Sequence, residues 1–244
     1  MGASWSGPVC VKVRKPEEEL RLGSSLERGD EQSSPQLLRI LGLHGNLQTR
    51  GYFTKQCAQL QQALEGMATI EVLEAPHWTL NGGRGWIESD MNLGPAPEAQ
   101  TKAHRKWTQT LALLRGHLES SGPYDGVMGY SMGTPTLTCL LAACAAEGVS
   151  PPFRFALCFN GYAPVSHHQL MADLEAHKPL KIPSLHVLGE QDWIPPHVSL
   201  RLVGFYQEAG RKLIRHPGKH DLPRNAADIS EVVDFVRQFA AKHT

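Results

Sequence analysis

The stretch VMGYSMG, residues 127–133, places a serine between two glycines directly after a run that is typical of a buried strand. Residues 129–133 fit the pattern G-x-S-x-G, in which a serine occupies a sharp turn between a strand and a helix. The pattern indicates a nucleophile at Ser131, but a glycine-eased turn with an N-capping serine has the same letters. The rest of the sequence must therefore supply the partners that a nucleophile needs.

Short apolar runs alternate with longer amphipathic segments from residue 36 onward. This alternation predicts an α/β fold with a mainly parallel, doubly wound sheet flanked by helices. The expected strands are 37–43, 68–73, 124–128, 153–159, 184–189 and 212–215. The expected helices are 52–65, 98–119, 132–147, 197–209 and 225–242. In such sheets, functional residues follow the carboxyl ends of the strands, and Ser131 meets that condition.

The first 35 residues differ from the rest of the chain, since they are polar and poor in aromatic side chains. We expect residues 1–35 to form a flexible N-terminal extension, with one short strand at Val9–Val13. Residues 36–244 are expected to form one α/β domain, because 244 residues suffice for a single sizeable core.

Composition excludes several classes of function. The chain has 24 Lys and Arg residues against 24 Asp and Glu residues, so bulk charge gives no attraction to nucleic acid or anionic membranes. No apolar run approaches the ~18 residues of a membrane-spanning helix, and we expect no secretory signal at the N-terminus. Five cysteines without a C-x-x-C pattern predict free thiols and a cytoplasmic location. We expect no metal and no cofactor.

A serine hydroxyl needs a base to take its proton, and the base needs an orienting carboxylate. In this fold class the chain order is serine, acid, histidine. Asp192 follows the strand 184–189, as the acid should, and Glu190 is its rival. His220 lies in the loop after the last strand and is preferred as the base over His216, which belongs to the strand end.

The negative charge that forms on attack requires two N–H donors. Met132, the residue after the serine, is expected to give one of them. Asn46, in the loop after the strand 37–43, is expected to give the other, with Leu47 as the alternative. His44 is expected to brace this loop and not to carry a proton.

Three segments of the sequence resemble the FSH-type serine hydrolases, which are the fungal family and its ovarian-cancer-associated relatives. The segments are 43–48, 122–133 and 216–220, and the resemblance covers roughly residues 36–240. It implies an α/β-hydrolase fold, hydrolysis of carboxylic esters or thioesters, and a triad of Ser131, Asp192 and His220. Met132 departs from the Gln of many members, but only its backbone should be needed.

Residues 75–97 form a glycine-rich apolar segment that we expect to cover a pocket for an acyl chain. Trp86 resembles a tryptophan that the family carries in the loop over its pocket, and Leu47 is a second expected substrate contact. Packing of these side chains as a satellite core is the alternative interpretation.

Three functions remain open from the sequence. The first is a hydrolase that cleaves small-molecule esters with an apolar acyl group through an acyl-enzyme intermediate. The second is a thioesterase that releases acyl or polyketide chains from a carrier, which would make an acyl carrier a partner. The third is a binding module of the same fold without turnover.

Overall fold

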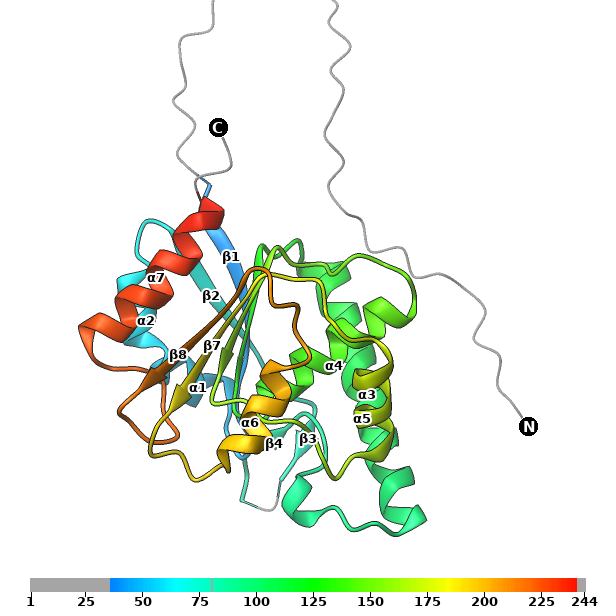
Figure 1. Cartoon of the computed structure of the whole chain (residues 1–244). Helices are drawn as coiled ribbons and strands as arrows, with labels where there is room; N and C mark the ends of the chain where they lie inside the picture. The colour runs from blue at the N-terminus through cyan, green and yellow to red at the C-terminus, as the bar shows by residue number, and fades with distance from the viewer. Residues whose placement is uncertain (1–35, 80, 241–244) are drawn as a thin grey trace, which may run out of the picture.

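The structure is a computed structural model of the chain, and it describes residues 36–79 and 81–240. Six parallel strands form one sheet in the order β2-β1-β5-β6-β7-β8 (Figure 1). Their bounds are β1 Leu38–Leu43, β2 Ala68–Leu73, β5 Gly126–Tyr130, β6 Phe155–Phe159, β7 Ser184–Gly189 and β8 Arg211–His216. The predicted fold class is confirmed.

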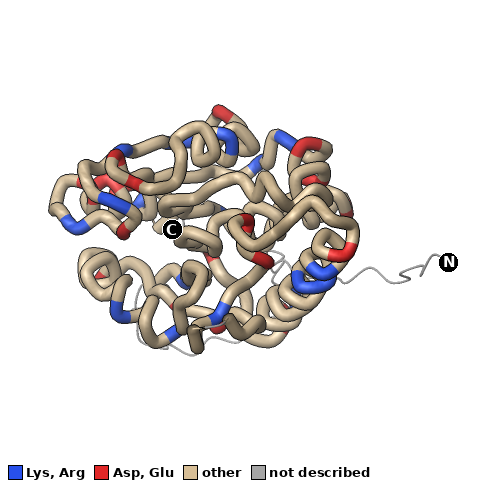
Figure 2. Tube along the Cα trace, turned by 90° about the horizontal axis from the view of Figure 1, so that it is seen from below, with Lys and Arg blue, Asp and Glu red and all other residues tan. Residues whose placement is uncertain are grey.

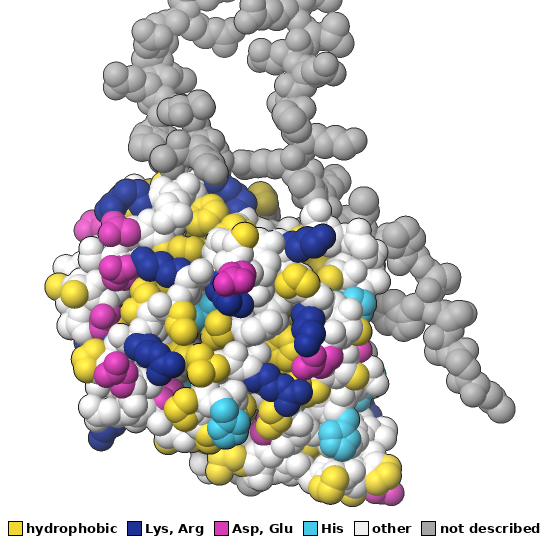
Figure 3. All heavy atoms as spheres, viewed as in Figure 1, with side chains coloured by type: hydrophobic (Ala, Val, Ile, Leu, Met, Phe, Trp, Pro, Cys, Tyr) yellow, Lys and Arg dark blue, Asp and Glu magenta, His cyan; other side chains and the backbone are white. Residues whose placement is uncertain are grey.

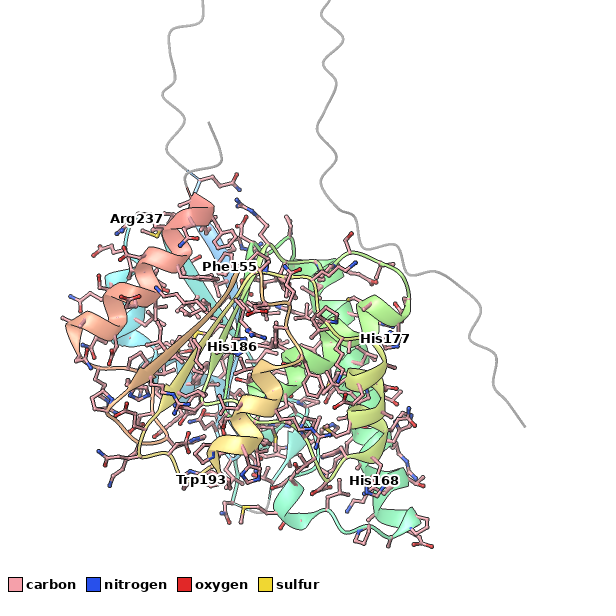
Figure 4. All side chains as sticks on the ribbon, viewed as in Figure 1. Phe155, His168, His177, His186, Trp193 and Arg237 are labelled. Carbon is pink, nitrogen blue, oxygen red and sulfur yellow. The ribbon has the colours of Figure 1, made fainter. Side chains whose placement is uncertain are left out.

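Helices cover both faces of the sheet, and each face has its own apolar core (Figure 1). One face packs against α1 (Arg50–Gln56), α2 (Ala58–Ala63) and α7 (Ala226–Ala240). On this side Phe155 stacks on Phe239 with 4.6 Å between ring centroids, between the sheet and α7 (Figure 4). The other face packs against α3 (Pro97–Ser121), α4 (Gly133–Ala146), α5 (His168–Ala176) and α6 (Pro196–Val203).

The burial patterns explain why these segments form these elements. The buried residues of α3 recur at spacings of three and four, which gives the helix one apolar stripe: Ala103, Trp107, Thr110, Leu114 and Leu118. Helix α4 is buried on almost all sides, and its Pro135 lies in the first turn, where a missing N–H costs little. Every residue of β5 and β6 is buried, as expected for central strands covered on both faces.

Several details differ from the expectations. The helix expected at 52–65 is divided into α1 and α2 at Cys57, and the helix expected at 197–209 ends at Val203. The short hairpin of β3 (His77–Trp78) and β4 (Arg84–Gly85) and the short 3-10 helix η1 (Asp90–Asn92) were not expected. Helix α5 was not expected either, and the expected strand at Val9–Val13 lies outside the described residues.

The carboxyl ends of the strands meet at the lower edge of the sheet in Figure 1. Figure 2 looks at the molecule from that side, and charges of both signs are interspersed there. The face shown in Figure 3 likewise mixes apolar and charged side chains without a large patch of one charge. No helix within residues 36–79 and 81–240 has the length and apolar character required to cross a membrane.

Candidate active site

The serine of the G-x-S-x-G pattern sits on the turn between β5 and α4. Its φ is +51°, in the left-handed region that non-glycine residues seldom occupy. The Ser131 N–H donates to the carbonyl oxygen of Phe159 at 2.9 Å, and its own carbonyl accepts from the N–H of Thr134 at 3.0 Å. These bonds hold the backbone in a strained conformation, which is a feature of sites where a side chain must be presented.

The glycines on either side of the serine are required by close contacts. A Cβ atom added at Gly133 would lie 2.0 Å from the carbonyl oxygen of Leu43. One added at Gly129 would lie 2.5 Å from Leu137 and 2.7 Å from the backbone of Gly133. The strand and helix backbones can therefore approach this closely only if both positions lack a side chain.

The three residues of the expected triad are in hydrogen-bond contact. The Nε2 atom of His220 lies 2.8 Å from the Ser131 hydroxyl oxygen. The Nδ1 atom of His220 lies 2.9 and 2.8 Å from the two carboxylate oxygens of Asp192. Because a carboxylate only accepts, this geometry assigns the proton to Nδ1 and leaves Nε2 free to accept from the serine. The His220 and Asp192 side chains retain 14% and 8% of their exposure, so water has little access to the pair.

The rival residues lie elsewhere. The backbone N–H of Glu190 donates to the carbonyl of His216, whereas the carboxylate that reaches His220 is that of Asp192. His216 is buried, and its Nδ1 accepts from the N–H of Gly218 at 3.2 Å. The structure therefore brings the preferred acid and base together and leaves both rivals outside the contact.

The loop after β1 packs on the serine turn. A Cβ added at Gly45 would lie 3.1 Å from the ring of Tyr130 and 3.2 Å from the Cβ of Ser131. Among the described residues, none accepts a hydrogen bond from the N–H of Asn46, Leu47 or Met132. Unpaired donors beside a nucleophile are suited to a developing oxyanion. Asn46, Met132 and the alternative Leu47 therefore all remain candidate donors.

His44 fixes the start of this loop. Its Nδ1 lies 2.7 Å from the carbonyl oxygen of Gly45, and its Nε2 accepts from the N–H of Ala75 at 3.1 Å. Burial lowers the pKa of His44, although Glu74 opposes that shift. Both nitrogens are thus occupied by the backbone, as a bracing role requires.

The two expected substrate contacts differ in exposure. Leu47 is 51% exposed, so a substrate can reach it. Trp86 is fully buried, and its Nε1–H donates to the carbonyl of His44 at 2.8 Å. Substrate could touch Trp86 only if the segment 75–97 moved, and the packing of Trp86 and Ile87 in the core follows the alternative interpretation.

Three residues near the triad were not singled out from the sequence. The Trp193 ring centroid lies 5.1 Å from that of His220, and the side chain is 64% exposed in the loop between β7 and α6 (Figure 4). The Tyr130 hydroxyl and the Asn160 amide both contact the loop that carries His220. All three lie at or just after the carboxyl end of a strand, a position that could have identified them.

One cavity of the molecule lies away from Ser131, His220 and Asp192. Within the part of the chain that the structure describes, no cluster of three or more His, Cys, Asp or Glu side chains is arranged to hold a metal. A cavity of about 510 Å³ lies beside α1, α2 and β2, and none of the triad residues lines it.

Comparison with known proteins gives consistent results. The profile described as "Serine hydrolase (FSH1)" matches residues 33–232. Esterase OVCA2 from Homo sapiens is 30% identical over 227 residues, which cover 83% of this chain and 97% of that protein. Esterase OVCA2 from Bos taurus is 29% identical over 228 residues, covering 84% of this chain and 97% of that protein.

Solved structures agree on the fold. The crystal structure of esterase PE8 matches with a TM-score of 0.58 at 16% identity, covering 85% of this chain and 95% of that chain. Acyl-protein thioesterase 2 from Zea mays matches with a TM-score of 0.54 at 17% identity, covering 84% and 94%. At these identities the similarity establishes the α/β-hydrolase fold alone. Because the family profile spans most of the sequence, the chain belongs to the FSH1 family of serine hydrolases.

Proposed function

We propose that this serine hydrolase cleaves carboxylic esters with an apolar acyl group through a catalytic triad of Ser131, His220 and Asp192. The observation that carries the proposal is the continuous chain of contacts, with 2.8 Å from Ser131 Oγ to His220 Nε2 and 2.8 Å from His220 Nδ1 to Asp192. A base at this distance can take the hydroxyl proton as the oxygen attacks.

In the first half of the reaction, the Ser131 oxygen bonds to the ester carbonyl carbon while its proton passes to His220 Nε2. The carbonyl oxygen becomes an oxyanion, which the N–H groups of Met132 and Asn46 stabilise. The intermediate then collapses, the bond to the alcohol oxygen breaks, and His220 returns the proton to the leaving alcohol. Ser131 is left acylated.

In the second half, a water molecule takes the place of the alcohol. His220 removes one of its protons as the water oxygen attacks the acyl carbon. The tetrahedral intermediate collapses, the bond to Ser131 breaks, and His220 returns the proton to the serine oxygen. The products are a carboxylic acid and the regenerated enzyme, and Asp192 stabilises the imidazolium that forms in each half.

Exposed apolar side chains beside the triad favour an apolar acyl group. Leu47 and Trp193 are 51% and 64% exposed at the carboxyl edge, where a substrate chain could cover them. Burying such surface on binding is worth roughly 25 cal/mol per Å². Relatives that align with more than four fifths of the chain are named esterases, which supports the ester as the substrate class.

Thioester hydrolysis uses the same acyl-enzyme chemistry and is the second candidate, with an acyl carrier as the partner in that case. An assay on oxygen and thiol esters with the same acyl group separates the two. We expect turnover of the oxygen ester. Turnover of the thiol ester alone would replace the first candidate by the second.

The proposal is tested by labelling with a fluorophosphonate, which reacts with activated serines. We expect the wild-type protein to be labelled and the Ser131→Ala protein to be unlabelled. Loss of the nucleophile should lower kcat by about six orders of magnitude, as in a serine protease. Folded wild-type protein that resists the probe would instead indicate a binding module without turnover.

We extend the proposal to a cytoplasmic location. The described cysteines are all free thiols, Cys57, Cys139, Cys144 and Cys158. Free thiols are usual where glutathione and thioredoxin keep proteins reduced.

A further inference from the structure

The loop between β8 and α7, residues 217–225, carries His220 and is called the base loop below. A histidine on a loop can serve as a base only if the loop backbone is fixed, because a displacement of about 1 Å can cost a factor of about 100 in rate. The base loop has no regular secondary structure to fix it. Hydrogen bonds to its backbone therefore help to fix its position, and several of them are made to its carbonyl oxygens.

Two side chains hold adjacent carbonyl groups at the base itself. The hydroxyl of Tyr130 donates to the carbonyl oxygen of His220 at 2.6 Å. The amide nitrogen of Asn160 donates to the carbonyl oxygen of Asp221 at 2.6 Å. Tyr130 is the last residue of β5, and Asn160 directly follows β6, so the two donors come from neighbouring strand ends.

Asn160 also contacts the strand that leads to the acid. Its side-chain oxygen accepts from the N–H of Gly189 at 2.8 Å, and its backbone N–H donates to the carbonyl of Val187 at 2.8 Å. Asn160 is fully buried and has a φ of +46°. One amide thus joins the end of β7, three residues before Asp192, to the base loop, a task that needs a donor and an acceptor on one short side chain.

Tyr130 is packed as tightly as Asn160. Its ring is 5% exposed and lies between the rings of Phe53 and His220, with centroid separations of 5.6 and 5.4 Å. Burial raises the pKa of Tyr130 to about 12, so its hydroxyl keeps the proton that it donates at neutral pH. Tyr130 is also the residue before Ser131, which ties the base loop directly to the serine turn.

We propose that Tyr130 and Asn160 are positioning residues that keep the His220 ring in simultaneous contact with Ser131 and Asp192. This proposal rests on the proposed function, because the two hydrogen bonds have this role only if His220 is the catalytic base. The proposal does not require either side chain to touch the substrate. They act through the carbonyl groups of His220 and Asp221, on the backbone to which the imidazole is attached.

The first test removes a single hydroxyl. Tyr130→Phe keeps the ring between Phe53 and His220 and removes the hydroxyl, and with it the donor to the His220 carbonyl and the contact of that hydroxyl with the Gln56 side chain. We expect kcat on a p-nitrophenyl ester to fall between about 10-fold and 100-fold, with KM unchanged, because the base is displaced and the substrate contacts are not. The rate constant for fluorophosphonate labelling should fall by a similar factor.

Tyr206→Phe is the matched control. Tyr206 is also a buried tyrosine, and its hydroxyl lies 2.8 Å from the hydroxyl of Thr138 and 3.6 Å from the sulfur of Cys158, outside the triad. Tyr206→Phe, like Tyr130→Phe, removes one hydroxyl group from a buried tyrosine. We expect Tyr206→Phe to lower the melting temperature and leave kcat within about twofold of wild type, whereas Tyr130→Phe lowers kcat.

The second test uses Asn160→Gly, which tolerates the positive φ and removes both amide contacts. We expect it to lower kcat at constant KM as Tyr130→Phe does. The double variant should lose less than the product of the two single losses, because both residues hold one loop.

Unchanged kcat in both single variants would overturn the proposal, as would a rise in KM with constant kcat. A loss of the same size in Tyr206→Phe would also overturn it, because the effect would then reflect general weakening of the core. Failure of the proposed function looks different, since wild-type protein would then lack both ester turnover and labelling that depends on Ser131.

Discussion

At the scale of single residues, the site combines a strained serine with a histidine, the proposed base, that already contacts it. Ser131 has a φ of +51° and lies 2.8 Å from His220 Nε2. The strained backbone and the ordered side chains are unfavourable by themselves, and the rest of the fold stabilises them before a substrate binds. Preorganisation of this kind is what allows a weak nucleophile to react at neutral pH.

The two histidines near the end of β8 should differ sharply in importance. We expect His220→Ala to abolish ester turnover, because His220 is the base that contacts Ser131 among residues 36–79 and 81–240. We expect His216→Ala to keep kcat near the wild-type value, since that ring contacts the Gly218 N–H and not the serine. Steady-state kinetics with circular dichroism as a folding control would test this. The reverse outcome would reassign the base.

The glycines offer another matched pair. Gly133→Ala would place a Cβ 2.0 Å from the Leu43 carbonyl oxygen, so the serine turn must shift and we expect turnover to fall at least about 100-fold. Gly116 is exposed within α3, and a Cβ there meets nothing within 4 Å. Gly116→Ala should leave turnover unchanged and stabilise the fold by about 0.5–1 kcal/mol, measured by urea unfolding. Equal turnover in both variants would contradict the close approach at the turn.

At the scale of secondary structure, the carboxyl ends of several strands of the sheet each lead to one part of the proposed site. Strand β1 leads to the proposed oxyanion loop, β5 to the serine, β7 to Asp192 and β8 to His220. Strand β6 contributes no triad residue but leads to Asn160. Parallel strands place all these loops at one edge, so residues distant in sequence meet without long connections.

Strand β7 also carries a buried histidine whose protonation should affect stability. Burial lowers the pKa of His186 to about 3, and the ring packs against Tyr206 inside the core (Figure 4). Above pH ~6.5 this group is neutral in the folded and the unfolded chain. Below that pH only the unfolded chain gains the proton, so the free energy of unfolding should decrease by up to about 1.4 kcal/mol per pH unit until pH ~3.

The measurement is urea unfolding of wild type and His186→Gln at pH 7 and pH 5. The free energy of unfolding of the variant should depend less steeply on pH, because the variant lacks the imidazole that only the unfolded chain protonates. Some pH dependence should remain, because other titrating groups, including His44, are present in both proteins. Identical pH dependence in the two proteins would show that His186 is protonated in the folded state as readily as in the unfolded one.

At the scale of the whole molecule, two apolar cores pack on the two faces of one sheet. Leu114 of α3 is fully buried, whereas Leu200 of α6 is 39% exposed on the same side of the sheet. We expect Leu114→Ala to lower the free energy of unfolding by about 2–5 kcal/mol, and Leu200→Ala by no more than about 0.5 kcal/mol. Thermal unfolding should remain a single transition in both. Equal losses would show that the α3 stripe is not part of the core.

The sequence was sufficient for the features that repeat along the chain. Alternating apolar runs predict all six strands of the sheet, and the rule that sites follow strand ends predicts Ser131, Asp192 and His220, which the structure brings into contact. Two-residue strands such as β3 and β4 carry no periodicity, so they could not be found. Helix α5 does have apolar residues at helical spacing, Leu170, Met171 and Leu174, but with nine residues it is short and its periodic pattern spans little more than one turn.

Contacts between distant loops could not be predicted from the sequence. The burial of Trp86 depends on its hydrogen bond to the His44 carbonyl, 42 positions away along the chain. The contact between Tyr130 and the His220 carbonyl spans 90 positions. The local sequence does not indicate which carbonyl group will accept such a hydrogen bond, because this depends on the backbone paths of both segments in the folded protein.

Burial of the thiols has a consequence for how the protein can be handled. Desolvation raises the pKa of Cys57 and Cys158 to about 12, and it also raises the pKa values of Cys139 and Cys144. The thiolate is the reactive form, so iodoacetamide and peroxide should modify these sulfurs far more slowly in the folded molecule than in molecules that have opened. With Cys10 replaced by serine, the rate of alkylation would count opening events in native buffer, without any denaturant.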